Sequence, residues 1–238
     1  MMTKTNEPRP QPVPLQVGML VYPALTLLDL IGPQTALSMH GQTHLVAKTL
    51  DPVMSDSGIA ILPTATYDTC PRDLDVLFVP GGMGTADAME DTATLSFLAA
   101  RARTASYVTS VCSGSLILAA AGLLDGYRAT THWTSLDVLA AFGVQAERQR
   151  VVVDRNRITG GGVTAGIDFG LTLVALLRGE TAAELTQLTM EYDPRPPFNA
   201  GSPETAAPEV TALARGFIEP VYSRTLAIAR RQHAQLRT

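Results

Sequence analysis

Cys112 is a small nucleophilic residue at the junction of a predicted strand and a predicted helix. Tyr107 to Val111 are mostly β-branched or aromatic, which favours a strand, and Leu116 to Ala121 is an apolar run of good helix formers. The small residues at 113–115 let the chain reverse sharply, so that the Cys112 side chain would project at the C-terminal edge of a sheet. This pattern predicts a nucleophile elbow.

The predicted helix after Cys112 has consequences for the sulfur. Its first N–H groups and the positive end of its dipole would point at the side chain, which favours the thiolate, the reactive form of cysteine. The alternative is a small buried apolar residue, which is what most free cysteines are. The position of Cys112 at an elbow favours the functional interpretation.

Asp29 is a carboxylate in an apolar stretch. Its neighbours at positions 27, 28, 30 and 31 are leucine and isoleucine. Burial among them would raise the pKa of the carboxyl, and a raised pKa suits proton transfer near neutral pH. A helix N-cap, or a core carboxylate satisfied by backbone N–H groups, explains the same pattern equally well at this stage.

Two glycine-rich turns follow predicted strands. Residues 74–79 form an apolar strand that ends in Pro-Gly-Gly, where Gly81 and Gly82 would let backbone N–H groups approach a ligand as an oxyanion hole or anion nest. Residues 160–166 form a second such turn before a helix. His132 ends a short strand and could orient or protonate a group near Cys112, although a histidine at a strand end is more often structural.

Composition describes a globular protein and limits its partners. The chain has 238 residues, 46% hydrophobic and 17% charged, with a net charge of −4 and no basic cluster before the C-terminal tail, which gives little support for nucleic-acid binding. No apolar run is long enough to cross a bilayer. The two cysteines and the polar, proline-rich start fit a reducing cytoplasm better than secretion. Residues 1–14 are expected to be a flexible lead, and 15–238 a single domain.

The order of elements predicts an α/β fold. About six strands alternate with helices, which favours one parallel-rich sheet covered by helices on both faces. Expected strands cover 15–22, 44–49, 74–79, 107–111, 150–154 and 158–159, with a hairpin at 54–63 and a short strand within 126–132. Expected helices cover 33–39, 94–103, 116–121, 133–142, 167–177 and 208–230, and 192–203 is expected to be irregular because of its prolines.

Four motifs together resemble the DJ-1/PfpI superfamily. They are P-G-G at 80–82, V-C-S-G-S at 111–115, A-T-T-H-W at 129–133 and T-G-G-G-V-T-A-G-I-D at 159–168. The resemblance extends over residues 15–191 and implies a flavodoxin-like fold with the cysteine at its elbow. L-D-L-I-G-P at 28–33 and E-Y-D-P-R-P-P-F-N-A-G-S-P at 191–203 are similar to the isonitrile (isocyanide) hydratases within it.

The resemblance implies a reaction and roles for three side chains. An isocyanide, R–NC, would gain water to become an N-substituted formamide, with Cys112 as nucleophile through a thioimidate and Asp29 as general acid and base. Ser113 stands where the hydratases commonly have threonine. Serine keeps the hydroxyl and the backbone N–H but loses the methyl that restricts the side-chain rotamer.

The remaining expectations concern binding groups and partners. Gly81, Gly82, Gly161 and Val163 are expected to form substrate or oxyanion contacts, with His132 as a possible supporting group. The chemistry requires no organic cofactor, and the cysteine and histidine spacings do not match a metal site. The superfamily implies a homodimer, with the apolar and proline-rich C-terminal parts as candidate contacts.

Three alternatives remain open. One is a ligand-sensing or regulatory protein that does not bind DNA. Regulators of the AraC type carry a similar domain with an A-T-T-H-W stretch, but only about 35 residues follow the proline-rich segment here, too few for their DNA-reading module. A Cys/His hydrolase acting on an amide, or a glyoxalase-like enzyme, would use the same elbow, the hydrolase with His132. A redox sensor would only require oxidation of Cys112.

Overall fold

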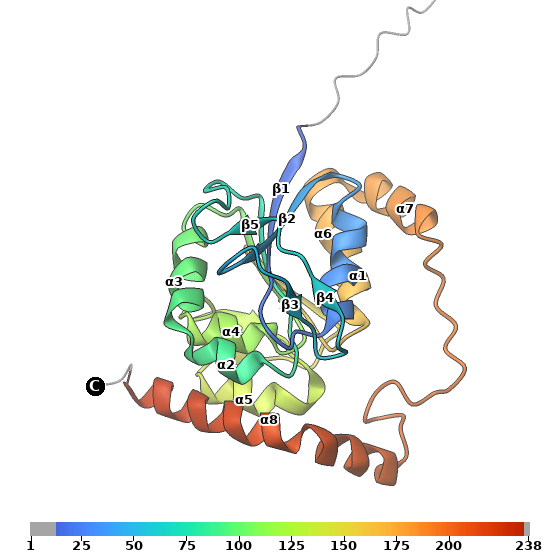
Figure 1. Cartoon of the computed structure of the whole chain (residues 1–238). Helices are drawn as coiled ribbons and strands as arrows, with labels where there is room; N and C mark the ends of the chain where they lie inside the picture. The colour runs from blue at the N-terminus through green and yellow to red at the C-terminus, as the bar shows by residue number, and fades with distance from the viewer. Residues whose placement is uncertain (1–12, 236–238) are drawn as a thin grey trace, which may run out of the picture.

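A seven-stranded sheet forms the centre of the computed structural model, which describes residues 13–235 (Figure 1). Neighbouring strands are parallel except for the antiparallel pair at one edge, β10 with β11. The predicted parallel-rich sheet is therefore confirmed. In spatial order the strands are β10 (Val151–Asp154), β11 (Arg157–Gly160), β7 (Tyr107–Val111), β6 (Val76–Val79), β1 (Leu15–Leu20), β2 (Gly41–Ala47) and β5 (Ala65–Thr66).

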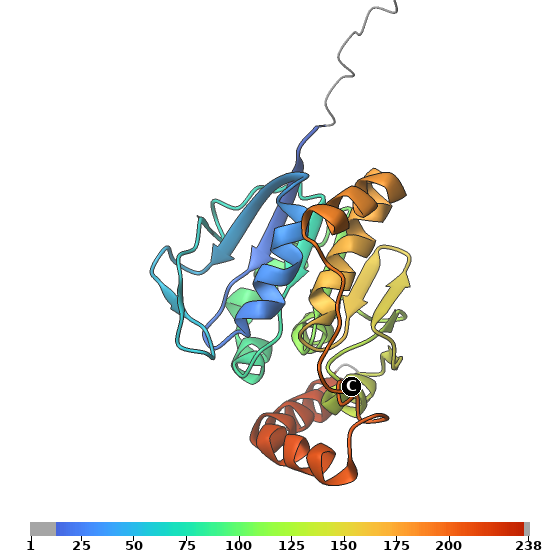
Figure 2. The ribbon, with the colours of Figure 1, turned by 90° about the vertical axis from the view of Figure 1, so that its right-hand side faces the viewer.

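Helices cover both faces of the sheet. On one face α1 (Leu27–Leu37) packs on α6 (Ala165–Arg178), which is followed by α7 (Glu180–Thr189) (Figure 2). On the other face lie α3 (Thr92–Arg101) and α4 (Gly114–Ala120), with α2 (Thr85–Glu90) and α5 (Leu136–Ala141) beside α4. The long α8 (Pro208–Gln235) packs across α2 and α5.

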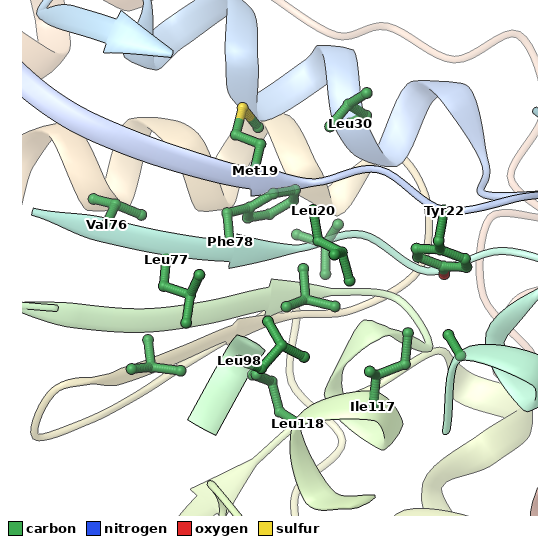
Figure 3. Packing of buried hydrophobic residues seen from close by; sticks show 14 of the residues in the cluster. Met19, Leu20, Tyr22, Leu30, Val76, Leu77, Phe78, Leu98, Ile117 and Leu118 are labelled. Carbon is green, nitrogen blue, oxygen red and sulfur yellow. The ribbon is translucent and has the colours of Figure 1, made fainter. Parts of the chain in front are cut away.

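The core lies between the sheet and these helices. Figure 3 shows successive side chains of β1, Met19 and Leu20, on opposite faces, as the period of a strand requires. Met19 lies with Phe78 toward α1, whereas Leu20 lies toward α4 and its Ile117. All are fully buried, and each such side chain stabilises the fold by about 1.5–3 kcal/mol.

Helix α1 begins earlier than expected. A short helix was predicted from Pro33, but α1 starts at Leu27 and contains Pro33 in its interior. A proline inside a helix removes one backbone hydrogen bond and crowds the preceding turn. The Pro33 ring instead fits against α6, where a Cβ on Gly166 would lie 3.1 Å from its Cδ. Glycine at position 166 therefore lets α1 pack closely against α6.

The smaller elements show where prediction succeeded and failed. The expected hairpin is present as β3 (Val53–Met54) and β4 (Ala60–Ile61), and residues 192–203 are irregular as expected. The expected helix at 133–142 is a 3-10 turn, η1 (Trp133–Ser135), followed by α5. The short strands β8 (Arg128–Ala129) and β9 (Gln145–Ala146) form a parallel pair. Four elements were not predicted from the sequence: α2, α7, β5 and β9. The expected lead at 1–14 lies almost wholly outside the described residues.

Candidate functional site

Cys112 occupies a strained elbow directly after β7. Its φ of 54° lies in the left-handed region, which is unfavourable for a residue other than glycine. Surrounding hydrogen bonds hold this conformation: the Cys112 N–H donates to the carbonyls of Gly160 (3.1 Å) and Gly161 (2.9 Å) at the end of β11. The elbow predicted from the sequence is present, and a neighbouring strand braces it.

The carbonyl of Cys112 is held as well. It accepts hydrogen bonds from the hydroxyls of Thr131 (3.0 Å) and Ser115 (3.3 Å). Thr131 lies in the A-T-T-H-W stretch. The sequence pattern indicated a role for the histidine of this stretch but not for Thr131. Its position immediately before His132 was the only signal that the sequence offered.

Asp29, in the first turn of α1, is completely buried. One carboxylate oxygen, Oδ2, accepts the N–H of Gly81 at 3.2 Å, while Oδ1 has no hydrogen-bond partner of standard geometry among residues 13–235. Burial raises the pKa of Asp29 to about 7, although hydrogen bonding with the Cys112 thiol and the Gly81 N–H opposes the rise. The predicted rise in the pKa of Asp29 is confirmed. The alternative of a carboxylate satisfied by backbone N–H groups holds for one of its two oxygens, Oδ2.

The electrostatics of Cys112 differ from expectation. The N-terminus of α4 was expected to favour the thiolate, but burial and the neighbouring charge of Asp29 raise the pKa of the thiol well above its usual value. The N–H and hydroxyl of Ser113 act in the opposite direction and do not prevail. The sulfur is therefore a neutral thiol at rest, because it is buried and faces a carboxylate.

Ser113 belongs to a compact set of hydroxyls beside the sulfur. Its Oγ accepts the Gly82 N–H (3.1 Å) and lies 2.7 Å from Oγ1 of Thr85, whose hydroxyl donates to the Gly82 carbonyl (2.7 Å). The Tyr22 hydroxyl, 3.4 Å from Thr85, donates to the Pro80 carbonyl (3.0 Å). Sequence reasoning missed Thr85 and Tyr22, since neither lies in a recognised motif and only their burial reveals them.

The predicted binding glycines surround this centre, but their N–H groups are occupied. Gly81 donates to Asp29, Gly82 to Ser113, and Gly161 to the Arg150 carbonyl (2.8 Å). An oxyanion role for these groups therefore requires a substrate to displace a protein acceptor, and it stays a prediction. Val163, expected to join them, is half-buried in the turn after β11, where its carbonyl accepts the Gly166 N–H (3.3 Å).

Gly81 is a glycine for a steric reason. A Cβ at this position would lie 2.6 Å from the backbone nitrogen of Ser113 and 2.8 Å from Cβ of Cys112. Real Cβ atoms do not approach backbone so closely. The absence of a side chain therefore allows the loop after β6 to contact the elbow.

His132 takes part in a separate arrangement. Its Nδ1 lies 2.7 Å from the hydroxyl of Thr134, and the ring packs against Gly162, where a Cβ would lie 2.2 Å from Cδ2. Burial lowers the pKa of His132 to about 4, so the ring is neutral at pH 7. Within residues 13–235 it makes no hydrogen bond to Cys112, and the Cys/His pairing that the hydrolase alternative needs is not formed.

A surface network connects the C-terminal segment to the elbow. The Tyr192 hydroxyl donates to Oδ2 of Asp168 (3.0 Å), which also accepts from Nε of Arg150 (2.8 Å). Because the Arg150 carbonyl holds the Gly161 N–H and the Gly161 carbonyl holds the Cys112 N–H, this chain of contacts reaches the nucleophile. The hydrogen bond of Tyr192 thus connects the start of the segment 192–207 to the residues that hold Cys112.

The described part of the chain contains two cysteines, Cys70 and Cys112. Cys70 and Cys112 are both buried and free of disulfides. No three histidine, cysteine, aspartate or glutamate side chains between residues 13 and 235 are grouped so that they could hold a metal ion. Over the same range, no helix combines the length and apolarity needed to cross a membrane.

Comparison with known proteins agrees with this geometry. The sequence profile of the DJ-1/PfpI family matches residues 16–176. The chain is 49% identical over 224 residues to isonitrile hydratase of Pseudomonas putida, covering 93% of this chain and 98% of that protein. A crystal structure of a THiJ/PfpI family protein from Pseudomonas syringae is 52% identical and superposes with a TM-score of 0.90, covering 96% and 97% of the two chains. The transcriptional regulator GbdR of Pseudomonas aeruginosa is 33% identical over 74% of this chain, but only 50% of the regulator is covered. Because the family profile matches residues 16–176 and the isonitrile hydratase relative is similar over nearly the whole chain, this chain belongs to the DJ-1/PfpI family.

Proposed function

We propose that this protein is an isonitrile hydratase, an enzyme that adds water to an isocyanide and releases an N-substituted formamide. The relative of that name is similar over nearly the whole of both chains. The observation that carries the proposal is the buried pair of Asp29 and Cys112, in which a carboxyl with a pKa of about 7 lies beside a neutral thiol. Such a carboxyl can accept and return a proton near neutral pH.

In the first half of the reaction the thiol adds to the isocyanide carbon. Asp29 takes the proton from Cys112 as the sulfur attacks and delivers it to the same carbon. One S–H bond breaks, one S–C bond and one C–H bond form, and the product is the thioimidate R–N=CH–S–Cys112. The neutral thiol supplies the proton that the substrate carbon must gain, so the raised pKa of Cys112 is suited to this step.

In the second half water releases the product. Asp29, again a carboxylate, removes a proton from water as the oxygen attacks the thioimidate carbon, and passes this proton to the nitrogen. The tetrahedral adduct R–NH–CH(OH)–S–Cys112 then expels the sulfur, and Asp29 transfers the hydroxyl proton of the adduct to that sulfur, leaving R–NH–CHO and the thiol. The atoms and electrons balance with two side chains and water, so no redox partner is needed. Ser113, whose N–H and hydroxyl both stabilise negative charge on the sulfur, assists this departure.

The experiment that tests the proposal is turnover of p-nitrophenyl isocyanide, followed by absorbance and by mass spectrometry of the formamide. Wild type is expected to produce the formamide, whereas Cys112→Ala and Asp29→Asn should lose activity by at least about a thousandfold. Cys70→Ala and Asp125→Asn are matched controls, since Cys70 is the other free thiol and Asp125 is an exposed carboxylate. An inert wild type across several isocyanides, or full activity in Asp29→Asn, would contradict the proposal.

The proposed enzyme acts in the cytoplasm as a homodimer. Supporting the dimer, Leu213 and Phe217 on α8 and Phe198 in the irregular segment leave 75%, 75% and 78% of their surface exposed, and such large exposed apolar side chains are candidates for an interface. Light scattering during gel filtration should give twice the monomer mass, and Leu213→Asp with Phe217→Asp should shift it toward the monomer. A wild-type monomer at micromolar concentration would exclude this arrangement.

A further inference from the structure

A cavity of about 520 Å³ lies at the carboxyl ends of β1, β2 and β5. Residues at and just after these strand ends form one side of it, and α2 with the start of α3 forms the other. Small-molecule sites in proteins usually have volumes of about 300–1,000 Å³. Neither Cys112 nor Asp29 lines this cavity, so it is separate from the proposed active site.

The interior of the cavity is apolar, and its hydroxyls already have acceptors. The apolar lining comes from Val21, Pro23, Ala47, Val53 and Ala88. The Thr94 hydroxyl donates to Asp91, so the Tyr67 hydroxyl, whose oxygen lies 2.8 Å from that of Thr94, donates to Thr94. An apolar ligand group can therefore cover these side chains without breaking a hydrogen bond.

The rim of the cavity is charged but balanced. Nζ of Lys48 lies 2.8 Å from Oδ2 of Asp91, and Oδ1 of Asp87 lies 2.6 Å from Nη2 of Arg224 on α8. A charged ligand would lose water without meeting an unpaired opposite charge, which is unfavourable. Lys48 still offers hydrogen-bond donors, since an ammonium group has three and Asp91 accepts one. The site therefore fits an uncharged molecule with an apolar body and a carbonyl oxygen placed toward Lys48.

The cavity and the active site share a wall made of the loops after β1 and β6. Pro23 and Gly84, one from each loop, line the cavity, and a Cβ on Gly84 would lie 1.9 Å from the Pro23 carbonyl oxygen. The Gly84 N–H donates to the carbonyl of Ala24 (3.0 Å), and the Ala24 N–H donates to the carbonyl of Met54 (2.8 Å). Because the φ of Ala24, 57°, lies in the left-handed region, these hydrogen bonds hold a strained residue in the wall.

The same loops hold catalytic groups on their other side. The Gly82 N–H donates to Oγ of Ser113 (3.1 Å), and the Gly81 N–H donates to Asp29 (3.2 Å). The Thr26 N–H joins the two loops through the Gly81 carbonyl (2.9 Å). A ligand that contacts the wall from the cavity would stabilise this arrangement, because opening either loop would remove part of its contacts.

We propose that the cavity is a second ligand site, which binds an uncharged organic molecule with an apolar body and a carbonyl oxygen, and that the bound molecule stabilises the loops after β1 and β6. Such a molecule influences the active site without entering it. The inference goes beyond the proposed function and does not depend on it, since neither the cavity nor its wall requires a reaction at Cys112.

Binding of p-fluoroacetanilide, followed by fluorine NMR, tests the site and the ligand class. Wild type should bind this uncharged amide with a Kd of about 0.1–1 mM, as expected for its size. Ala88→Phe fills the cavity and should weaken binding at least about tenfold, whereas Ala140→Phe, on the exposed side of α5, should not. Lys48→Met removes the donor and should weaken binding about threefold to tenfold. The anion p-fluorobenzoate should bind at least about fivefold more weakly than the amide.

Hydrogen exchange measures the effect on the loops. With the probe at three times its Kd, the amides of Ala24 and Gly84 should exchange about fourfold more slowly, while those of the β10–β11 pair should not change. Unchanged exchange of Ala24 and Gly84 would overturn the inference, as would no binding at about ten times the expected Kd. Binding that Cys112→Ala weakens and Ala88→Phe does not would place the probe in the active site and overturn it too. Val53→Trp, with the same expectation, replaces Ala88→Phe if thermal unfolding shows that the phenylalanine variant does not fold.

Discussion

The backbone N–H of Gly81 donates a hydrogen bond to Oδ2 of Asp29 at 3.2 Å, and this contact determines how the carboxylate can act. It anchors one oxygen to the loop after β6, while the Thr26 N–H donates to the Gly81 carbonyl (2.9 Å) and closes a two-way connection. The second oxygen, Oδ1, is left without a standard partner among residues 13–235. One oxygen thus holds the group in place and the other is available for a proton.

The buried Asp29 should make stability depend on pH. Its pKa rises from 3.8 in an unfolded chain to about 7, so between these values the folded state binds the extra proton and stability falls as pH increases. The contribution is present below pH 4 and is lost by about pH 7, amounting to about 4 kcal/mol. Urea unfolding of wild type and Asp29→Asn at pH 5 and pH 8 should detect about 3 kcal/mol of this contribution, and the asparagine variant should lose most of the dependence. Asp125→Asn should retain it; equal pH profiles for wild type and Asp29→Asn would contradict the assignment.

Removing the Asp29 charge should activate the thiol while abolishing turnover. The carboxylate raises the pKa of Cys112, so Asp29→Asn should lower the pKa of the thiol and speed its alkylation by iodoacetamide at pH 8. Wild type should react slowly at pH 7 and faster as pH rises past 9. A Cys70→Ala background leaves Cys112 as the single thiol. Slower alkylation in Asp29→Asn would show that the carboxylate acts on the sulfur mainly as a base.

Gly81→Ala should destabilise the fold and distort the elbow. The added methyl would meet backbone atoms of Ser113 and Cβ of Cys112 at less than 3.0 Å, and relieving such overlap typically costs about 1–3 kcal/mol. Gly216→Ala is the matched control, because a Cβ there meets nothing within 4 Å and alanine in the α8 interior should stabilise by about 0.5–1 kcal/mol. Urea unfolding measures the change in the free energy of unfolding for each variant, which should fall for Gly81→Ala and rise for Gly216→Ala. Equal stability of the two variants would refute the close approach.

Tyr192→Phe should loosen the segment that follows it. The substitution removes the hydrogen bond to Asp168, which is worth about 1 kcal/mol, and releases the tether between residues 192–207 and α6. Chymotrypsin cleavage after the exposed Phe198 should accelerate about threefold to fivefold. Tyr107→Phe changes a tyrosine whose hydroxyl has no hydrogen bond in the described structure, and its cleavage rate should match wild type. An unchanged rate in Tyr192→Phe would mean that the segment is held elsewhere.

Local pattern was enough to predict the framework of the site. The strand at 107–111 and the small residues after Cys112 specify a sharp turn wherever they occur, and apolar neighbours around Asp29 indicate burial without any knowledge of the fold. The start of α1 was misplaced because a proline normally ends or opens a helix. The glycines of α6, far along the chain, leave room for Pro33 in the interior of α1.

The sequence by itself thus determined the elbow, the parallel-rich sheet and a carboxylate with a raised pKa, since each depends on residues adjacent in the chain. Tertiary structure alone decided the raised pKa of Cys112, the occupied N–H groups of the glycine turns, the lack of a hydrogen bond between His132 and Cys112 among residues 13–235, and the contact of Ser113 with Thr85. The physical reason is that burial and electrostatic interactions sum over all neighbours in space. At this site the neighbours come from α1, α2 and the ends of three strands, whose proximity no local pattern records.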